Sequence, residues 1–322
     1  MSTVFSRLVR PDDLPDSLWD RSDQVLSIAP SLVTAYTTLL DRHGLRTLAM
    51  QTPPDGPVGG VSKEETDKHL AWGFPGSAAR VQLAVLDPKS HVPHIADAFT
   101  RLLAGNKVAI ADVPCGSGAA VLSILATLAE LRKHERVPRE PLDLVIVTGE
   151  ISEFARRYAA EGFGELRTTL EEQAIWIEPV FLHWDVCDKL SNTDLIREIT
   201  IRSRECGARL LVVANFSGFL QRAGKLTAAQ PQLEELFRHV RAEQCSVIWI
   251  EPQWKDVTKV DGGMFSRLKE WLIRKCAPFA RPFDTGDPTQ VAATTACDVR
   301  HVLDPSRKVE TRLAVMRCDL HR

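Results

Sequence analysis

The feature of this sequence that most limits its fold is a series of short apolar runs that begins after Lys107. Runs of strand length alternate there with segments long enough to form amphipathic helices. This alternation is typical of a parallel β-sheet whose two faces are covered by helices. The five runs span residues 108–113, 142–147, 179–184, 209–215 and 246–251.

Two further strand candidates, at 291–303 and 310–318, follow without a helix between them. They are joined only by the turn sequence DPSRK at 304–308. Such a short connection joins antiparallel strands. The sequence therefore predicts an α/β fold with a seven-stranded, mainly parallel sheet that ends in an antiparallel hairpin, with helices on both faces.

The first third of the chain has a different pattern. Residues 1–106 show helical periodicity without strong strand signals, and the clearest helix is expected at 31–42. The Pro- and Gly-rich stretch at 52–60 should be a loop. We expect a helical cap at 1–106, on the substrate side of the molecule, and a sheet domain at 107–322.

Composition restricts the partners. The 40 Lys and Arg residues nearly balance the 42 Asp and Glu residues, so the net charge of −2 provides no overall field that would hold a polyanion. Contact with nucleic acid would need a local basic patch. The stretch 253–281 is one candidate, although a solvated helix face explains its charges more simply.

The seven cysteines are scattered and include no Cys-x-x-Cys pair. This spacing disfavours a metal site, an iron–sulfur cluster or a disulfide framework, and it favours a reducing compartment. No apolar stretch reaches the length of a membrane span or of a signal core. We expect a cytoplasmic protein that makes no membrane contact.

Ligands of open α/β sheets bind beyond the carboxyl ends of the strands. Asp112 lies at the end of the first run, and the glycines Gly116 and Gly118 then lead directly into an apolar helix. Glycines allow backbone N–H groups to approach a ligand at a helix N-terminus. A P-loop is excluded because no Gly-Lys-Ser/Thr follows, and Val121 disfavours the nicotinamide fingerprint, which requires a small residue there.

These residues resemble a known family. The string DVPCGSG at 112–118 is similar to the glycine-rich motif of class I S-adenosylmethionine-dependent methyltransferases, and the resemblance extends over about 107–318. It implies S-adenosylmethionine as cofactor, with Glu150 accepting hydrogen bonds from the ribose hydroxyls and Asp185 near the adenine amino group. The family's sheet also has an antiparallel last strand. The candidate cofactor-binding residues are Asp112, Pro114, Cys115, Gly116, Gly118, Glu150, Asp185 and Asn215.

The motif departs from the usual pattern at Pro114, which replaces the first glycine. Two local alternatives stay open. Asp112 could cap the following helix, and Glu150 could be only an acidic residue in the first turn of a helix, where the helix dipole favours acids. The fourth run ends in Asn-Phe-Ser-Gly-Phe, without the Asn-Pro-Pro-aromatic signature of enzymes that methylate exocyclic base nitrogens. The segments VVANFSGFL and VIWIEPQW are faintly similar to the ribosomal small-subunit methyltransferase-like family.

The resemblance implies methyl transfer from S-adenosylmethionine by in-line displacement. If the acceptor needs a base, His183 and Glu251 are the candidates, because both lie at strand ends. A small-molecule acceptor is slightly favoured over RNA or protein, because the net charge is nearly neutral. The alternative is a catalytically silent scaffold or cofactor sensor, which Pro114 favours. An aromatic in the stretch 69–77 is a further candidate, as a gate of the acceptor pocket.

Overall fold

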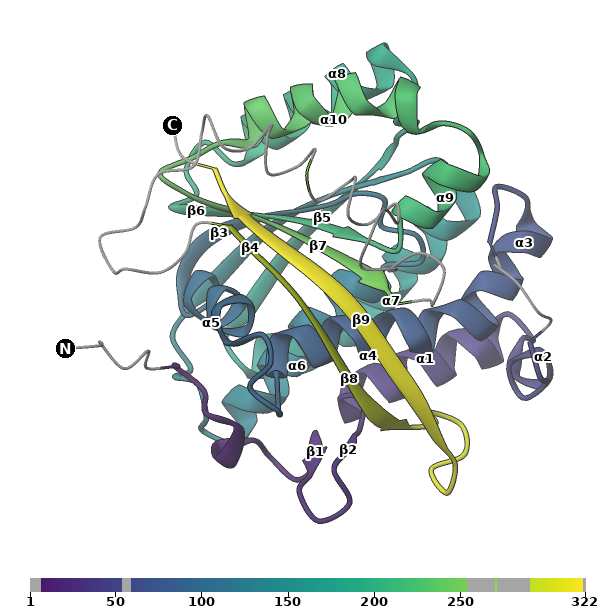
Figure 1. Cartoon of the computed structure of the whole chain (residues 1–322), viewed down its shortest axis with the longest axis vertical. Helices are drawn as coiled ribbons and strands as arrows, with labels where there is room; N and C mark the ends of the chain where they lie inside the picture. Colours follow the sequence, from purple (N-terminus) through teal and green to yellow (C-terminus); the bar gives the residue numbers. More distant parts are fainter. Residues whose placement is uncertain (1–6, 54–58, 254–269, 271–289, 321–322) are drawn as a thin grey trace.

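The computed structural model describes residues 7–53, 59–253, 270 and 290–320. Within these residues a mixed nine-stranded sheet has the order β1-β2-β8-β9-β7-β6-β3-β4-β5 (Figure 1). The strands are β1 (Trp19–Asp20), β2 (Val25–Leu26), β3 (Asn106–Asp112), β4 (Leu142–Glu150), β5 (Ile175–His183), β6 (Ala208–Ala214), β7 (Gln244–Pro252), β8 (Gln290–Arg300) and β9 (Lys308–Asp319).

The central five strands, from β5 to β7, are parallel to one another. From β3 the chain first moves outward through β4 to β5, and it then returns to the other side of β3 to add β6 and β7. The order therefore reverses between β3 and β6. This reversal separates the loops that follow the two strands and opens a crevice at their carboxyl ends.

The predicted antiparallel hairpin is confirmed, but the predicted count of seven strands is wrong. Strand β9 pairs antiparallel with both β7 and β8. The hairpin also does not end the sheet, because β2 pairs with β8 and β1 with β2. These two extra strands have only two residues each, too few for a period to be visible in the sequence. They are held by tertiary contacts, including an ion pair between Arg300 and Asp20 at 2.6 Å.

Helices cover both faces of the sheet, as predicted. Alternate residues of β6 show why: Leu210 and Val212 belong to one apolar core, and Leu211 and Val213 to the other. The helices around the first core are α1 (Pro30–Arg42), α2 (Arg46–Ala49), α4 (Phe74–Leu86), α5 (Pro93–Leu102), α6 (Ala119–Lys133) and α7 (Glu153–Glu172). Those around the second are α8 (Lys189–Arg202), α9 (Ser217–Arg222) and α10 (Leu226–Val240).

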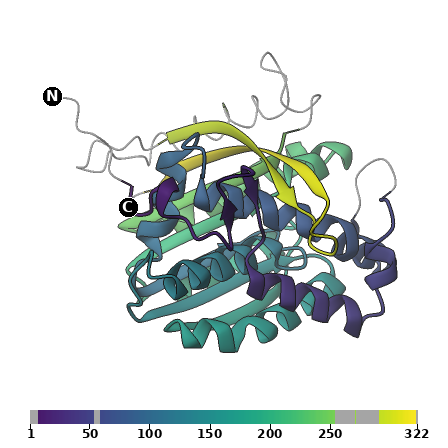
Figure 2. The ribbon, with the colours of Figure 1, turned by 90° about the horizontal axis from the view of Figure 1, so that it is seen from below.

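The helix expected at 31–42 is confirmed as α1. The N-terminal region also contains the short helices η1 (Pro11–Asp13), α3 (Lys63–Lys68) and η2 (His69–Gly73). Helix α1 packs on α7, and α4 packs on α6 and on the hairpin strand β9 (Figures 1 and 2). The N-terminal helices therefore share one apolar core with the sheet. The division of the chain at residue 106 stays a prediction.

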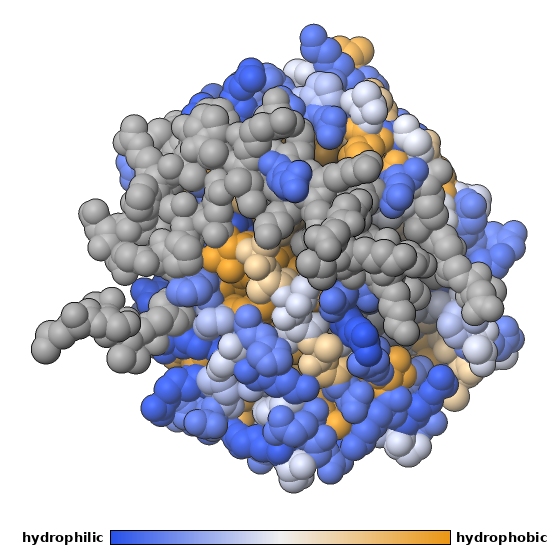
Figure 3. Space-filling model, viewed as in Figure 1, coloured by the Kyte–Doolittle hydropathy of each residue, from blue (hydrophilic) through white to orange (hydrophobic). Residues whose placement is uncertain are grey.

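No helix within the described ranges is long and apolar enough to cross a membrane. Hydrophilic side chains predominate over the lower part of the face seen in Figure 3, and hydrophobic ones form a few groups. The basic stretch at 253–281 lies outside the described residues, apart from Gln253 and Glu270.

Candidate functional site

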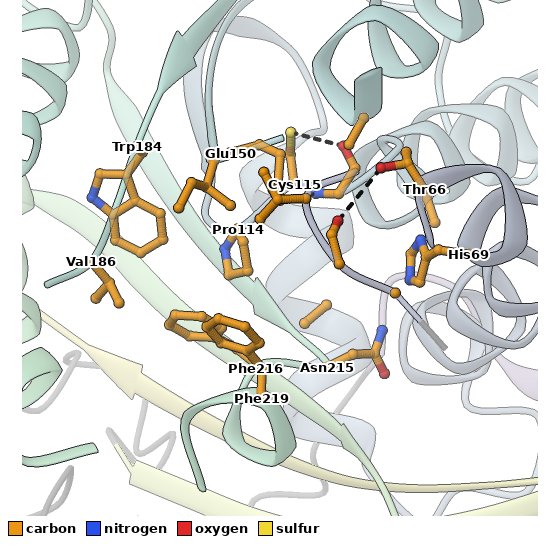
Figure 4. A pocket seen from close by; sticks show the side chains of 18 of the residues that line it. Thr66, His69, Pro114, Cys115, Glu150, Trp184, Val186, Asn215, Phe216 and Phe219 are labelled. Atoms are coloured by element: carbon orange, nitrogen blue, oxygen red, sulfur yellow. Dashed lines mark hydrogen bonds between the residues drawn. The ribbon is translucent and has the colours of Figure 1, made fainter. Parts of the chain in front are cut away.

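A cavity of about 200 Å³ lies at the carboxyl ends of β3, β4, β5 and β6, where the strand order reverses. Its walls come from the loops after these strands and from the N-terminal helices α3, η2 and α4 (Figure 4). Six of the predicted cofactor-binding residues line it: Pro114, Cys115, Gly116, Glu150, Asp185 and Asn215. Residues separated by up to a hundred positions thus meet in one pocket.

The glycine-rich loop enters the pocket from β3. Gly116 and Gly118 have φ angles of +52° and +84°, in the left-handed region that favours glycine. A Cβ atom on Gly118 would lie 3.1 Å from Leu122 Cδ1 and 3.2 Å from Ala159 Cβ. Gly118 does not line the cavity. It lets the loop turn sharply into α6 and lets α6 lie close to α7.

Asp112 is completely buried at the end of β3 and does not line the cavity. Burial raises the pKa of its carboxyl group well above the ordinary value, and the nearby negative charge of Glu150 raises it further. Both effects favour the protonated, neutral form. The structure therefore places Asp112 in the interior at the end of β3 and not among the residues that line the cavity.

Glu150, the last residue of β4, faces the cavity. Its Oε2 accepts a hydrogen bond from the backbone N–H of Gly116 at 3.0 Å, and its Oε1 accepts one from that of Ser152 at 2.9 Å. Burial raises the pKa of this carboxyl group, and the two backbone hydrogen bonds oppose the shift. Each oxygen keeps a further lone pair for a ligand. The carboxyl group thus joins the glycine loop to the tip of β4.

The loop after β5 brings Trp184 and Asp185 to the pocket. The Oδ1 atom of Asp185 accepts a hydrogen bond from the backbone N–H of Cys187 at 2.9 Å, which fixes the carboxylate in the loop. The indole N–H of Trp184 is donated to Asn192 Oδ1 at 3.1 Å. A Cβ atom on Gly149 would lie 3.0 Å from both Trp184 Cβ and Val113 Cγ1, so glycine makes this contact close without crowding.

Aromatic rings form one wall. The rings of Trp184 and Phe216 are 5.8 Å apart, and Phe219 stacks on Phe216 at 6.0 Å with an angle of 11° between the ring planes. The ammonium group of Lys225 lies 5.5 Å from the centre of the Phe219 ring. Phe219 is 36% exposed. The wall suits a flat, apolar or aromatic group.

On another side, Asn215 links β6 to the N-terminal helix α4. Its Nδ2 donates to Ser77 Oγ at 2.9 Å, and its Oδ1 accepts from Arg80 Nε at 3.1 Å. Burial lowers the pKa of Arg80 to about 10, although the charge of Glu251 opposes the shift. This hydrogen-bonded cluster holds the N-terminal helices against the strand tips.

The two predicted bases lie outside the cavity lining. His183 is exposed at the end of β5. Glu251 is buried, and its Oε1 accepts hydrogen bonds from Ser217 N at 2.8 Å, from Phe216 N at 3.0 Å and from the indole N–H of Trp249 at 2.5 Å. This carboxylate caps the beginning of α9. The sequence shows that both residues end strands, but it does not show on which side of the strand end they point.

His69 is one of several pocket residues that were not predicted individually. His69 lies in η2 and lines the cavity, within the stretch 69–77 that was expected to hold a gating aromatic. Of the aromatics in that stretch, Phe74 is buried and Trp72 donates its indole N–H to the Leu48 carbonyl at 2.8 Å. The only signal for His69 in the sequence was its position in this stretch.

The six cysteines in the described part of the chain are free. Cys115 lines the pocket, and burial raises the pKa of its thiol well above the ordinary value, which favours the unreactive protonated form. Over the same described residues, no three His, Cys, Asp or Glu side chains are grouped so that they could hold a metal ion.

Comparison with known proteins gives a distant structural likeness. No protein-family model matches the chain, and no curated protein matches it. Among the solved structures, the chain is similar to a protein of Pyrococcus horikoshii described as "a putative RNA methyltransferase". The two sequences are 12% identical, and the match covers 73% of this chain and 85% of the other, with a TM-score of 0.34. The roles of individual residues therefore rest on the pocket itself.

Proposed function

We propose that this chain binds S-adenosylmethionine and transfers its methyl group to an acceptor. One observation carries the proposal: the glycine loop, Glu150 and Asp185, which follow three consecutive strands, meet in a single cavity at the point where the strand order reverses. This is where open α/β sheets bind nucleotide-like ligands.

The residues present fit the cofactor. The carboxylate of Glu150 would accept hydrogen bonds from both ribose hydroxyls while it stays anchored by the Gly116 and Ser152 amides. Asp185 and the aromatic wall would hold the adenine, since a flat ring packs well against Phe216. Positive φ angles at the loop glycines let the backbone approach the rest of the cofactor closely.

This arrangement sets the direction of the bound cofactor. With the adenine near Trp184 and Val186 and the ribose at Glu150, the other end would point toward Thr66, His69 and Asn215, which lie on the opposite side of the pocket (Figure 4). The acceptor would then enter between the tip of β6 and the N-terminal helices. Residues 7–106 would thus provide one wall of the acceptor site.

When bound, S-adenosylmethionine supplies an activated methyl group on a positively charged sulfur. The task of the protein is mainly to hold the acceptor in line with the bond that breaks and to exclude water. The partly buried cluster of Asn215, Ser77 and Arg80 serves this by fixing the wall opposite the adenine. A small-molecule acceptor is favoured slightly over RNA or protein, because the overall charge is nearly neutral.

A catalytically silent cofactor sensor or scaffold is the second candidate. Pro114 favours it, because its ring lines the pocket where the family motif has its first glycine (Figure 4). Such a protein would keep the fold and the cofactor site but would transfer no methyl group.

Methyl transfer is tested by following a labelled methyl group from the cofactor to an acceptor. The purified chain is incubated with methyl-labelled S-adenosylmethionine and a cell extract divided into RNA, protein and small-molecule fractions. We expect label in one fraction, with the small-molecule fraction favoured, and a Glu150→Gln variant should lower the signal. Binding of the cofactor without label in any fraction would favour the silent sensor. Absence of binding would refute the proposed function.

A further inference from the structure

His69 sits in a slot formed by backbone from three segments. A Cβ atom on Gly73 would lie 2.8 Å from His69 Cδ2, and one on Gly59 would lie 3.3 Å from the same atom. A Cβ on Gly116, in the glycine loop, would lie 3.5 Å from His69 Cε1. Gly73 and Gly59 leave the space that the imidazole ring occupies, and Gly116 lies at ordinary van der Waals distance from it. The fold thus brings this ring directly against the candidate cofactor loop.

The ring is available for chemistry. Within the described residues, no side-chain hydrogen bond occupies either nitrogen of His69, although the ring lines the cavity. Burial lowers the pKa of His69 below 6.5, and the positive charge of Arg80 lowers it further. The neutral imidazole, which can accept a proton, is therefore the dominant form at neutral pH.

The other titratable groups of the pocket are less suited to accept a proton. Both carboxylate oxygens of Glu150 are held by backbone amides, and Asp185 stands in the chain between Trp184 and Val186, which lie across the pocket from His69 (Figure 4). Lys225 is a cation near Phe219, and Cys115 holds its proton tightly. His69 is the neutral base on the side where the methyl group would lie.

We propose that His69 is the general base of the methyl transfer and that the acceptor atom carries a proton, as in a hydroxyl or an N–H group. This inference rests on the proposed function. The acceptor oxygen or nitrogen forms a bond to the methyl carbon while the carbon–sulfur bond breaks and leaves its electron pair on sulfur. The proton of the acceptor moves to a ring nitrogen of His69, which later releases it to water.

The charges of the pocket fit this step. The positive charge on sulfur disappears as the imidazole gains one, so the total charge beside Arg80 is unchanged. A base with a lowered pKa also stays neutral in mildly acidic solution, where an ordinary histidine would be protonated. The transfer rate should therefore fall on acidification only below the ordinary histidine pKa of 6.5.

The experiment compares the wild type with His69→Gln, His69→Ala and a control, His239→Gln, whose side chain is exposed on α10. Transfer is measured with labelled S-adenosylmethionine and the extract fraction that the wild type labels. Calorimetry with S-adenosylmethionine and with its demethylated product measures binding separately. NMR of ring-labelled histidine follows the titration of His69, which the variant spectra assign.

We expect His69→Gln to bind both ligands like the wild type and to transfer methyl about 10²–10⁴-fold more slowly. At saturating S-adenosylmethionine, the acid limb of the pH–rate profile should disappear in this variant. Added imidazole should restore part of the rate of His69→Ala, and His239→Gln should behave like the wild type. The NMR titration should give a pKa below 6.5 for His69.

Three results would overturn the inference. Loss of cofactor binding in His69→Gln would make His69 a binding residue. An unchanged rate and pH profile in His69→Gln would show that His69 is not the base, and it would leave the proposed function intact. A wild type that binds the cofactor but labels no fraction would refute the methyl transfer itself, and the base with it.

Discussion

Two glycines illustrate how a single residue sets the local geometry. Gly118 has a φ of +84°, and its Cβ position is crowded by Leu122 and Ala159, whereas Gly164 in α7 has open space around it. We expect Gly118→Ala to lower the free energy of unfolding by about 1–3 kcal/mol, because the new Cβ is strained. Gly164→Ala should raise it by about 0.4–1 kcal/mol. Urea unfolding measures both, and equal effects would contradict the strained loop.

The side chain of Glu150 should make cofactor affinity depend on pH. Burial raises the pKa of Glu150 above 4.5, so its carboxylate gains a proton at a higher pH than an exposed glutamate does. The protonated form is a weaker acceptor for ribose hydroxyls. Cofactor affinity should therefore decrease as the pH falls through this raised pKa. In Glu150→Gln the affinity should lack this dependence. Titration calorimetry over a pH series provides the check, and identical pH profiles would refute the assigned role.

At the scale of elements, Glu251 joins the end of β7 to the beginning of α9. Its Oε1 accepts hydrogen bonds from Phe216, Ser217 and Trp249, and no water replaces them easily because the group is buried. Glu251→Ala should lower stability by about 3–5 kcal/mol, since it leaves buried donors without their acceptor and removes the negative charge that offsets the charge of Arg80. The exposed Glu205→Ala is the control and should change stability little. A mild effect of Glu251→Ala in urea unfolding would return this residue to the candidate bases.

The sequence predicted the elements whose burial makes them periodic or apolar. Strand β6 is buried along its whole length, so its run was visible, and each of the seven predicted strands lies on an observed one. The pair β1 and β2 was missed because its stability comes from β8, far along the chain. The same limit applies to the pocket. Strand order indicated where Glu150 and Asp185 meet, but only the packing of η2 brings His69 to them.

On the scale of the whole molecule, residues 7–103 and the sheet share one apolar core. Helix α4 packs between α6 and β9, and its residues Val81 and Leu83 are fully buried. We expect native-state hydrogen exchange to give the same opening free energy for the amides of α4 and β3, because both elements belong to this one apolar core. Opening of α4 at a clearly lower free energy would instead show that residues 1–106 form a separable cap.

Calorimetry measures directly how much Glu150 contributes to the affinity for the cofactor. S-adenosylmethionine and its demethylated product are titrated into the wild type, Glu150→Gln and Glu153→Gln, a control three residues away with an exposed side chain in the first turn of α7. Loss of a charge-assisted hydrogen-bond acceptor should weaken binding to Glu150→Gln by about tenfold to a hundredfold. The wild type and Glu153→Gln should bind equally. Equal binding by all three proteins, or by none, would contradict the account.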